Sequence, residues 1–345
     1  MPSKASAAAP PPTSRHSVLI ESEGAIPLAP TAPAAYTLRG STANFDVSYD
    51  SSLGSNGQAL ADAVLGSCEA DLAKFERFFG IGSPGRFTVS IYPGPGGASH
   101  AGCSARGINC ASWTGDGALE NFLNCAEVAE VFMASQNAGW NCGASAGEGL
   151  SRILAFELHP ASQWLPANRG GFITASFWLN SGRPDWVTQT EPTDIDKVSI
   201  GCATLFLNYL RHQLHFSLNQ IVQAGGTTLQ QTYERLTGSS VDAFGPFAAL
   251  LAGYFPPGTL VNFPPGTLNL PTDNPFPLSH VPGVVFDGAN GAAKEVVLAG
   301  LVPRFTGPGA ARPGSSFVNS QSPAAGQVVP GGSTVTMRLV IGPTP

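Results

Sequence analysis

Charged residues are scarce in this sequence. Lysine and arginine together number 17 and aspartate and glutamate 23, so only 12% of the 345 residues are charged and the formal net charge is -6. A nucleic-acid partner requires a cluster of basic side chains that neutralises several phosphates. The sequence has no such cluster, and we therefore exclude nucleic acid as a partner.

Long apolar runs are also missing. The longest candidate, FGPFAALLAGYF at Phe244–Phe255, is shorter than the roughly 18 residues of a membrane span and contains Pro246. Residues 1–35 are rich in alanine, proline and serine and lack the apolar core of a signal peptide. We expect neither a membrane span nor a signal peptide in this sequence.

Metal-binding and redox motifs built on paired cysteines or histidines are absent. No two of the six cysteines form CxxC, which excludes zinc-ribbon and thioredoxin-type motifs, and no two of the six histidines form HxxxH or HxH. The cysteines are Cys68, Cys103, Cys110, Cys125, Cys142 and Cys202. Their even number permits disulfides, with buried free thiols as the alternative, and Cys103 and Cys110 are close enough to bridge.

Glycine and proline are abundant, and their distribution divides the chain. The sequence contains 41 glycines and 30 prolines, and seven of the prolines lie in residues 254–280, where FPPGTL occurs twice. Such a composition predicts an extended spacer. We predict a disordered Ala/Pro-rich tail at 1–43, a folded domain at 44–253, a Pro-rich linker at 254–280 and a small module at 281–345.

Hydrophobic periodicity predicts an α+β fold for both folded parts. Alternating apolar residues predict strands in the first domain at 44–50, 86–94 and twice within 96–113, and in the C-terminal module at 301–305, 316–321 and 333–342. Apolar residues at helical spacing predict helices at 57–80, 120–135, 147–158, 199–214, 217–225, 228–238 and 289–299. The first domain is thus β-rich early and α-rich late.

Three glutamates draw attention within the helical part. Glu127 and Glu130 are three residues apart, so they share one face of the helix at 120–135. Glu148 follows Ser145 by three residues, the spacing of a capping box that begins the next helix. A solvated helix face and a helix cap are the simplest explanations of these glutamates.

The C-terminal module resembles a PASTA domain over its whole length. The resemblance rests on VPGVV at Val281, a helix that ends in AGLV, and the signature QSPAAGQVVPGGSTVTM from Gln321. It implies one helix packed on a three-stranded sheet, a location outside the cell or at the cell envelope, and either peptidoglycan binding or a spacing role. No residue of the module is expected to carry chemistry.

The first domain resembles a gluzincin-type metallopeptidase, a zincin with a small mixed sheet and helices, in the order of its strands and helices. In that family HExxH supplies two zinc ligands and the general base, and a later glutamate is the third ligand. Here AEVAE at Ala126–Glu130 stands in place of HExxH, and Glu148 follows Glu130 by 18 residues. The resemblance also places His100 on an edge strand beside the cleft.

Two functions follow from this resemblance. Ala126 has no donor atom, so the first hypothesis is a non-catalytic pseudopeptidase that binds no cofactor and is joined to a PASTA module for envelope binding or spacing. The alternative is a divergent metallohydrolase that acts on peptides or wall material, with Glu127 as catalytic base and Glu130 and Glu148 as metal ligands. Three carboxylates would favour a hard divalent metal such as calcium or manganese over zinc.

Overall fold

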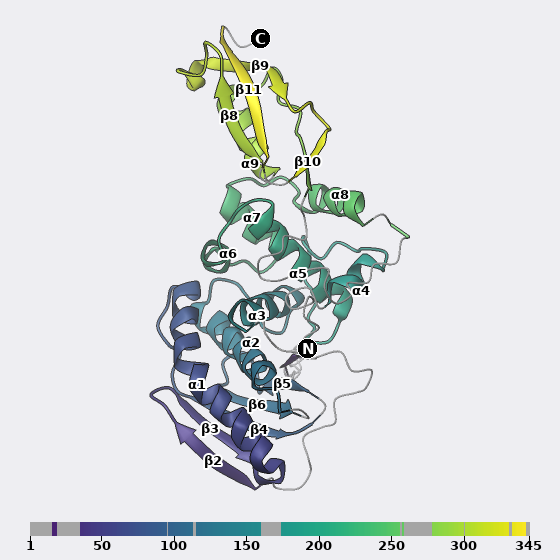
Figure 1. Cartoon of the computed structure of the whole chain (residues 1–345). Helices are drawn as coiled ribbons and strands as arrows, with labels where there is room; N and C mark the ends of the chain where they lie inside the picture. The colour runs from purple at the N-terminus through teal and green to yellow at the C-terminus, as the bar shows by residue number, and fades with distance from the viewer. Residues whose placement is uncertain are drawn as a thin grey trace, which may run out of the picture.

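The computed structural model of the chain is an α+β protein in which a six-stranded and a three-stranded sheet each pack on a separate hydrophobic core. The described residues are 16–18, 35–94, 96–112, 115–159, 174–255, 257–258, 278–299, 301–330 and 333–342. We call the described residues from 16 to 255 the N-terminal unit and those from 278 to 342 the C-terminal unit. The sheets of the two units lie at opposite ends of the molecule, with helices between them (Figure 1).

The sheet of the N-terminal unit is mixed and has the strand order β1-β5-β6-β4-β3-β2. The strands are β1 (His16–Val18), β2 (Tyr36–Ser41), β3 (Phe45–Asp50), β4 (Phe87–Pro93), β5 (Gly97–His100) and β6 (Gly107–Ser112). β3, β4 and β6 run parallel, whereas β2 and β5 are antiparallel to their neighbours. The short β1 pairs with the outer side of β5.

β2 corrects the predicted boundary of the N-terminal tail. We expected disorder through residue 43, but Tyr36–Ser41 pairs with β3 and belongs to the sheet. Its side chains are almost all exposed, with Leu38 at 59%. A strand without a buried face has no alternation of apolar and polar residues, so periodicity gives no signal for it.

Two long helices cover one face of this sheet (Figure 1). α1 (Gly54–Phe79) and α2 (Gly117–Gln136) confirm the helices predicted at 57–80 and 120–135. α1 ends at Gly80, which has a left-handed conformation (φ 68°) that glycine adopts without strain. Phe75 of α1 lies 5.8 Å, centroid to centroid, from Phe132 of α2, so aromatic packing joins the two helices.

The remaining helices of the N-terminal unit form a second layer. They are α3 (Ser145–Leu158), α4 (Ala175–Leu179), α5 (Lys197–His212), α6 (Leu218–Ala224), α7 (Leu229–Thr237) and α8 (Phe244–Tyr254). α3 lies between α2 and α5. A Cβ on Gly147 would lie 2.0 Å from the Asn141 carbonyl oxygen, and a Cβ on Gly149 would lie 2.7 Å from the Ala203 Cβ. These glycines let α3 approach its neighbours at backbone distance.

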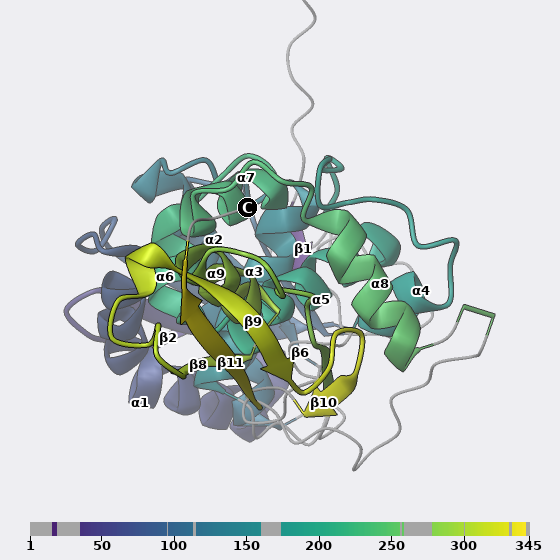
Figure 2. The same ribbon diagram turned by 90° about the horizontal axis from the view of Figure 1, so that it is seen from above.

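The C-terminal unit is a three-stranded mixed sheet with one helix. β8 (Val302–Thr306), β9 (Ser316–Ser322) and β11 (Thr334–Ile341) have the order β8-β11-β9, as Figure 2 shows from above, and α9 (Ala289–Leu298) packs against β8 and β9. β7 (Leu278–His280) pairs with β10 (Val328–Pro330). The unit therefore begins at Leu278, inside the predicted linker, whereas residues 259–277 of that linker lie outside the described residues.

One disulfide is present among the described residues, and it differs from the bridge that the sequence suggested. Cys103 is bonded to Cys142, which lies 39 positions later in the chain, in the loop between α2 and α3. Cys110 is a buried free thiol on β6, where it pairs in register with Ala98 of β5. Cys103 lies beyond the end of β5, so nearness in sequence does not bring it to Cys110.

No helix in the described part of the chain is both long enough and apolar enough to cross a membrane. α8 is the apolar segment noted in the sequence, and Pro246 lies in its first turn, where a missing backbone N–H costs no helical hydrogen bond.

Candidate functional site

The three glutamates selected from the sequence are all buried, which overturns the interpretation of Glu127 and Glu130 as a solvated helix face. Glu127 and Glu148 have no exposed surface, and Glu130 is 1% exposed. Glu127 and Glu130 lie on the face of α2 that α3 and β5 cover. The spacing that predicts a shared face is correct, but the partners that bury this face are distant in sequence.

His100 joins β5 to these glutamates. Its Nε2 lies 2.9 Å from the Glu130 Oε2 and 3.5 Å from the Glu127 Oε2, and its imidazole is fully buried. Its Nδ1 donates a hydrogen bond of 2.8 Å to the Gly102 carbonyl oxygen. Because a carbonyl oxygen only accepts, Nδ1 carries a proton, and the neutral form of His100 therefore has Nε2 unprotonated. The sequence identified His100 as the histidine nearest the cleft, but not its pairing with Glu130.

Glu148 is held by a cation that the sequence analysis missed. Arg152, one turn later on α3, forms a salt bridge with the Glu148 Oε2 and also donates a hydrogen bond of 2.9 Å to the Glu148 carbonyl oxygen. Arg152 is only 2% exposed. The i, i+4 spacing of glutamate and arginine was a signal for this pair, although not for its burial.

The predicted capping box at the start of α3 does not form. α3 begins after Ala144, which makes no side-chain cap. The Ser145 hydroxyl instead lies 3.2 Å from the Thr190 hydroxyl and accepts a hydrogen bond from the Glu191 backbone N–H. Glu148 is thereby available to Arg152, and it is a buried partner of that residue rather than a helix cap.

Burial controls the protonation of this cluster. It raises the pKa of Glu130 to about 8, although the positive charge of Arg152 acts in the opposite direction. Burial and the nearby Glu130 raise the pKa of Glu148, which Arg152 again opposes. Burial also lowers the pKa of His100. Both shifts favour the uncharged forms of Glu130 and His100, so burial favours a neutral hydrogen-bonded pair over an ion pair at this contact.

Ala126 is the first residue of the AEVAE segment. It is fully buried in the same core as the rest of α2 and contributes a methyl group without a donor atom. The donor atoms that do converge are one each from His100, Glu130 and Cys142, all within 4.8 Å of one another. Cys142 was not selected from the sequence, because its neighbours in space come from β5 and α2.

A further carboxylate, Glu120, lies two turns before Glu127 on α2. It is fully buried, and burial raises its pKa to about 7, an effect that the neighbouring Cys110 and Ser112 oppose. The sequence analysis missed Glu120, although its spacing of seven residues from Glu127 places both glutamates on one helix face. Few soluble domains bury so many carboxylates along one helix.

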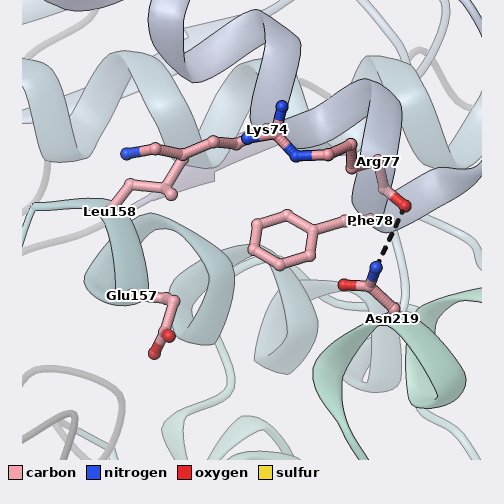
Figure 3. Close-up of a pocket in the computed structure, with 6 residues that line it drawn as sticks. All are labelled: Lys74, Arg77, Phe78, Glu157, Leu158 and Asn219. Carbon is pink, nitrogen blue, oxygen red and sulfur yellow. Dashed lines mark hydrogen bonds between the residues drawn. The ribbon is translucent and has the colours of Figure 1, made fainter.

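A separate cavity of about 330 Å³ lies between α1, α3 and α6 (Figure 3). It is lined by Lys74, Arg77, Phe78, Glu157, Leu158 and Asn219. Asn219 donates a hydrogen bond to the Arg77 carbonyl oxygen, and Lys74 and Glu157 face Asp71 and Arg211, respectively. Lys74 and Glu157 thus each have a partner of opposite charge, and we do not assign a ligand to this cavity.

A second cluster lies near this cavity. Donor atoms of Asp71, Cys125 and His159 lie within 4.8 Å of one another, and the His159 Nε2 is 2.7 Å from the Asp71 Oδ2. Burial raises the pKa of the Cys125 thiol well above its ordinary range. A protonated thiol is a poor nucleophile, so this shift does not favour a nucleophilic role for Cys125.

No protein-family model matches the chain, and no curated protein matches it.

Proposed function

We propose that the N-terminal unit is a non-catalytic, zincin-like domain in which Arg152 replaces the charge of a metal ion. The observation that carries this proposal is the buried salt bridge between Arg152 and Glu148, the residue in the position of the third metal ligand. A guanidinium balances the carboxylate without offering a coordination site. It therefore cannot lower the pKa of a bound water as a metal does.

The arrangement of elements supports the zincin-like part of the proposal. β5 is antiparallel beside parallel strands, α2 carries Glu127 and Glu130 beneath it, and α3 presents Glu148 to α2. This is the order of elements that the resemblance implies. The absence of a donor at Ala126 supports the non-catalytic part, since a buried methyl group cannot be replaced by a ligand through a rotamer change.

Metal content and hydrolysis test this proposal in the protein with the Cys103–Cys142 disulfide intact. We expect no stoichiometric divalent metal after purification and no hydrolysis of casein or peptidoglycan above the background of a heat-denatured sample. Stoichiometric metal that is lost in Glu148→Gln would overturn the proposal. Glu295→Gln is the matched control, because Glu295 is an exposed glutamate of the same chain.

The alternative is a metallohydrolase with Glu127 as base and Glu130 and Glu148 as ligands. One observation favours it, since the Glu130 Oε1 and the Glu148 Oε1 are buried and have no hydrogen-bond partner among the described residues. Hydrolysis that requires added calcium or manganese and disappears in Glu127→Gln would establish this alternative. Arg152 opposes it, because the guanidinium must leave Glu148 before a cation can bind there.

For the C-terminal unit we propose a PASTA-like module that binds peptidoglycan or spaces the N-terminal unit from a cell envelope. Gln321 of β9 supports this reading, because its side chain donates to the Pro282 carbonyl oxygen and accepts from the Val284 N–H, which joins both ends of the signature. The test is co-sedimentation of the full chain with peptidoglycan sacculi. A chain that ends at residue 277 should stay in the supernatant, and equal sedimentation of both chains would exclude the module as the binding part.

A further inference from the structure

We infer that reduction of the Cys103–Cys142 disulfide opens a transition-metal site formed by His100, Glu130 and Cys142. The three residues each offer one donor atom, and these nitrogen, oxygen and sulfur atoms lie within 4.8 Å of one another. All three residues are buried. The inference uses these contacts alone and does not depend on the zincin-like proposal.

The orientation of His100 fits a ligand. Metal-bound histidines almost always donate their other ring N–H to a carboxylate, a backbone carbonyl or a water, which fixes the tautomer and the ring. The Nδ1 of His100 makes such a bond of 2.8 Å to the Gly102 carbonyl oxygen. Its Nε2 consequently directs a lone pair toward the carboxyl group of Glu130.

Glu130 provides a second, independent indication of a ligand. It is 1% exposed, its Oε2 faces His100, and its Oε1 has no hydrogen-bond partner among the described residues. A buried, unpaired carboxyl oxygen is costly, and a cation would satisfy it. The site therefore contains an acceptor that lacks its partner in the disulfide form.

The donor set selects the metal class. Imidazole, thiolate and carboxylate together suit zinc or cobalt, whereas calcium and magnesium require oxygen ligands. One thiolate and one carboxylate also cancel the two positive charges of the ion. A neutral metal complex is the form that a buried position tolerates best.

The disulfide prevents metal binding at this site, because the Cys142 sulfur is not a thiolate ligand while it is bonded to Cys103. Cys103 is the more exposed of the two cysteines. A dithiol reductant attacks the Cys103 sulfur, the S–S bond breaks, and Cys142 leaves as a thiolate. The second thiol of the reductant then releases Cys103, so that the reductant is oxidised to its disulfide and both cysteines are reduced.

Metal binding follows this exchange. The ion binds the Cys142 thiolate, the unprotonated Nε2 of His100 and the carboxylate of Glu130. Any proton that the thiol or the carboxyl group carries passes to the buffer. Glu127, whose Oε2 lies 3.5 Å from the His100 Nε2, is the nearest further carboxylate.

Cobalt titration of single-cysteine variants tests the inference, because a thiolate bound to cobalt gives a charge-transfer absorption band. Cys103→Ser frees Cys142 permanently and should bind one cobalt ion per chain without reductant. Cys103→Ser with Cys142→Ser lacks the same disulfide and should lose the band. His100→Ala in the Cys103→Ser background should lose it as well.

The outcomes that would overturn the inference are equally specific. A folded Cys103→Ser variant without the band would show that no such metal site exists. A band that survives the loss of Cys142 and disappears in Cys125→Ser would show that the metal binds at Cys125 instead. If Cys103→Ser does not fold, the wild-type chain is stripped by a chelator, reduced with a phosphine that is then removed, and titrated. Absence of cobalt binding in that reduced chain overturns the inference.

Discussion

The two units differ in what their cores contain. The buried charged or titratable side chains of the N-terminal unit include Asp71, His100, Glu120, Glu127, Glu130, Glu148 and Arg152. Among the described residues of the C-terminal unit, no charged side chain is buried, and the core consists of apolar residues such as Val318, Val335 and Leu339. The C-terminal core thus follows the general rule that charged side chains are exposed, whereas the N-terminal core departs from it along α2 and α3.

The buried charged side chains of the N-terminal unit are not explained by a gain in stability. Apolar packing alone explains the C-terminal unit. A buried ion pair, by contrast, is often no more stable than an apolar pair of the same volume, so Glu148 and Arg152 are not explained by stability. Departures from the burial rule are expected at functional sites, and in this chain they coincide with the position of the proposed site.

The largest effect is expected from the removal of Arg152. Arg152→Met leaves Glu148 buried without its cation and should lower the free energy of unfolding of the N-terminal unit by about 3–5 kcal/mol. Urea unfolding followed by tryptophan fluorescence measures this unit alone, because all tryptophans precede residue 187. Arg152→Met with Glu148→Leu removes both charges and should recover most of the loss.

The control for this prediction is Arg338→Met in the C-terminal unit. Arg338 is exposed on β11, so calorimetry should show a change within about 0.5 kcal/mol. If Arg152→Met lowers the free energy of unfolding as little as Arg338→Met does, Glu148 does not need Arg152 as its buried partner. The proposed difference between the two units would then be contradicted.

The raised pKa of Glu120 predicts that the stability of the N-terminal unit depends on pH. Its pKa is about 7 in the folded chain and near 4.5 in the unfolded chain, so the folded state binds more protons between these values. Stability should therefore fall as pH rises from about 4.5 to about 7, by up to about 3 kcal/mol from this residue. Glu120→Gln should remove this part of the slope.

The comparison for Glu120 is made by urea unfolding at pH 4.5 and pH 8. The variant and the wild type should have similar stability at the lower pH, and the variant should be the more stable at the higher pH. Glu295→Gln in α9 is the matched control, since Glu295 lies in the C-terminal unit and its replacement should leave the slope of the N-terminal unit unchanged. An equal slope in Glu120→Gln and wild type would contradict the assignment.

The smallest expected effect concerns the connection between the units. Limited proteolysis within residues 259–277 should release a stable fragment that begins near Val281 and leave the N-terminal unit with unchanged tryptophan fluorescence. Leu298 of α9 packs at the margin of the N-terminal core, so a minor contact is lost on separation. Failure to obtain a folded C-terminal fragment would contradict the independence of its core.

Local patterns predicted the elements well and the site only in part. The helices at 57–80 and 120–135 and the strands at 44–50 and 86–94 are present because their apolar periodicity is strong. The shared face of Glu127 and Glu130 was also predictable. Their burial was not, because it depends on β5 and α3.

Residues that are distant in sequence account for what the sequence analysis missed. His100 and Glu130 are 30 residues apart, and Cys103 and Cys142 are separated by 39. Hydrophobic periodicity describes neighbouring residues and cannot predict a contact between residues so far apart in sequence. Arg152 was overlooked for a different reason, since an arginine one turn after a glutamate usually indicates an exposed pair on a helix surface.

The central claim is that Arg152 stands in place of a metal, and zinc titration tests it most directly. Two chains are compared with the disulfide intact: Ala126→His with Glu130→His, and the same pair combined with Arg152→Ala. Both restore the two histidines of a zinc peptidase beside Glu148, but only the second frees Glu148 as a ligand. Circular dichroism first establishes that both chains are folded. We predict at least about tenfold tighter zinc binding in the triple variant, equivalent to about 1.4 kcal/mol. Equal zinc affinity in the two folded chains would contradict the claim.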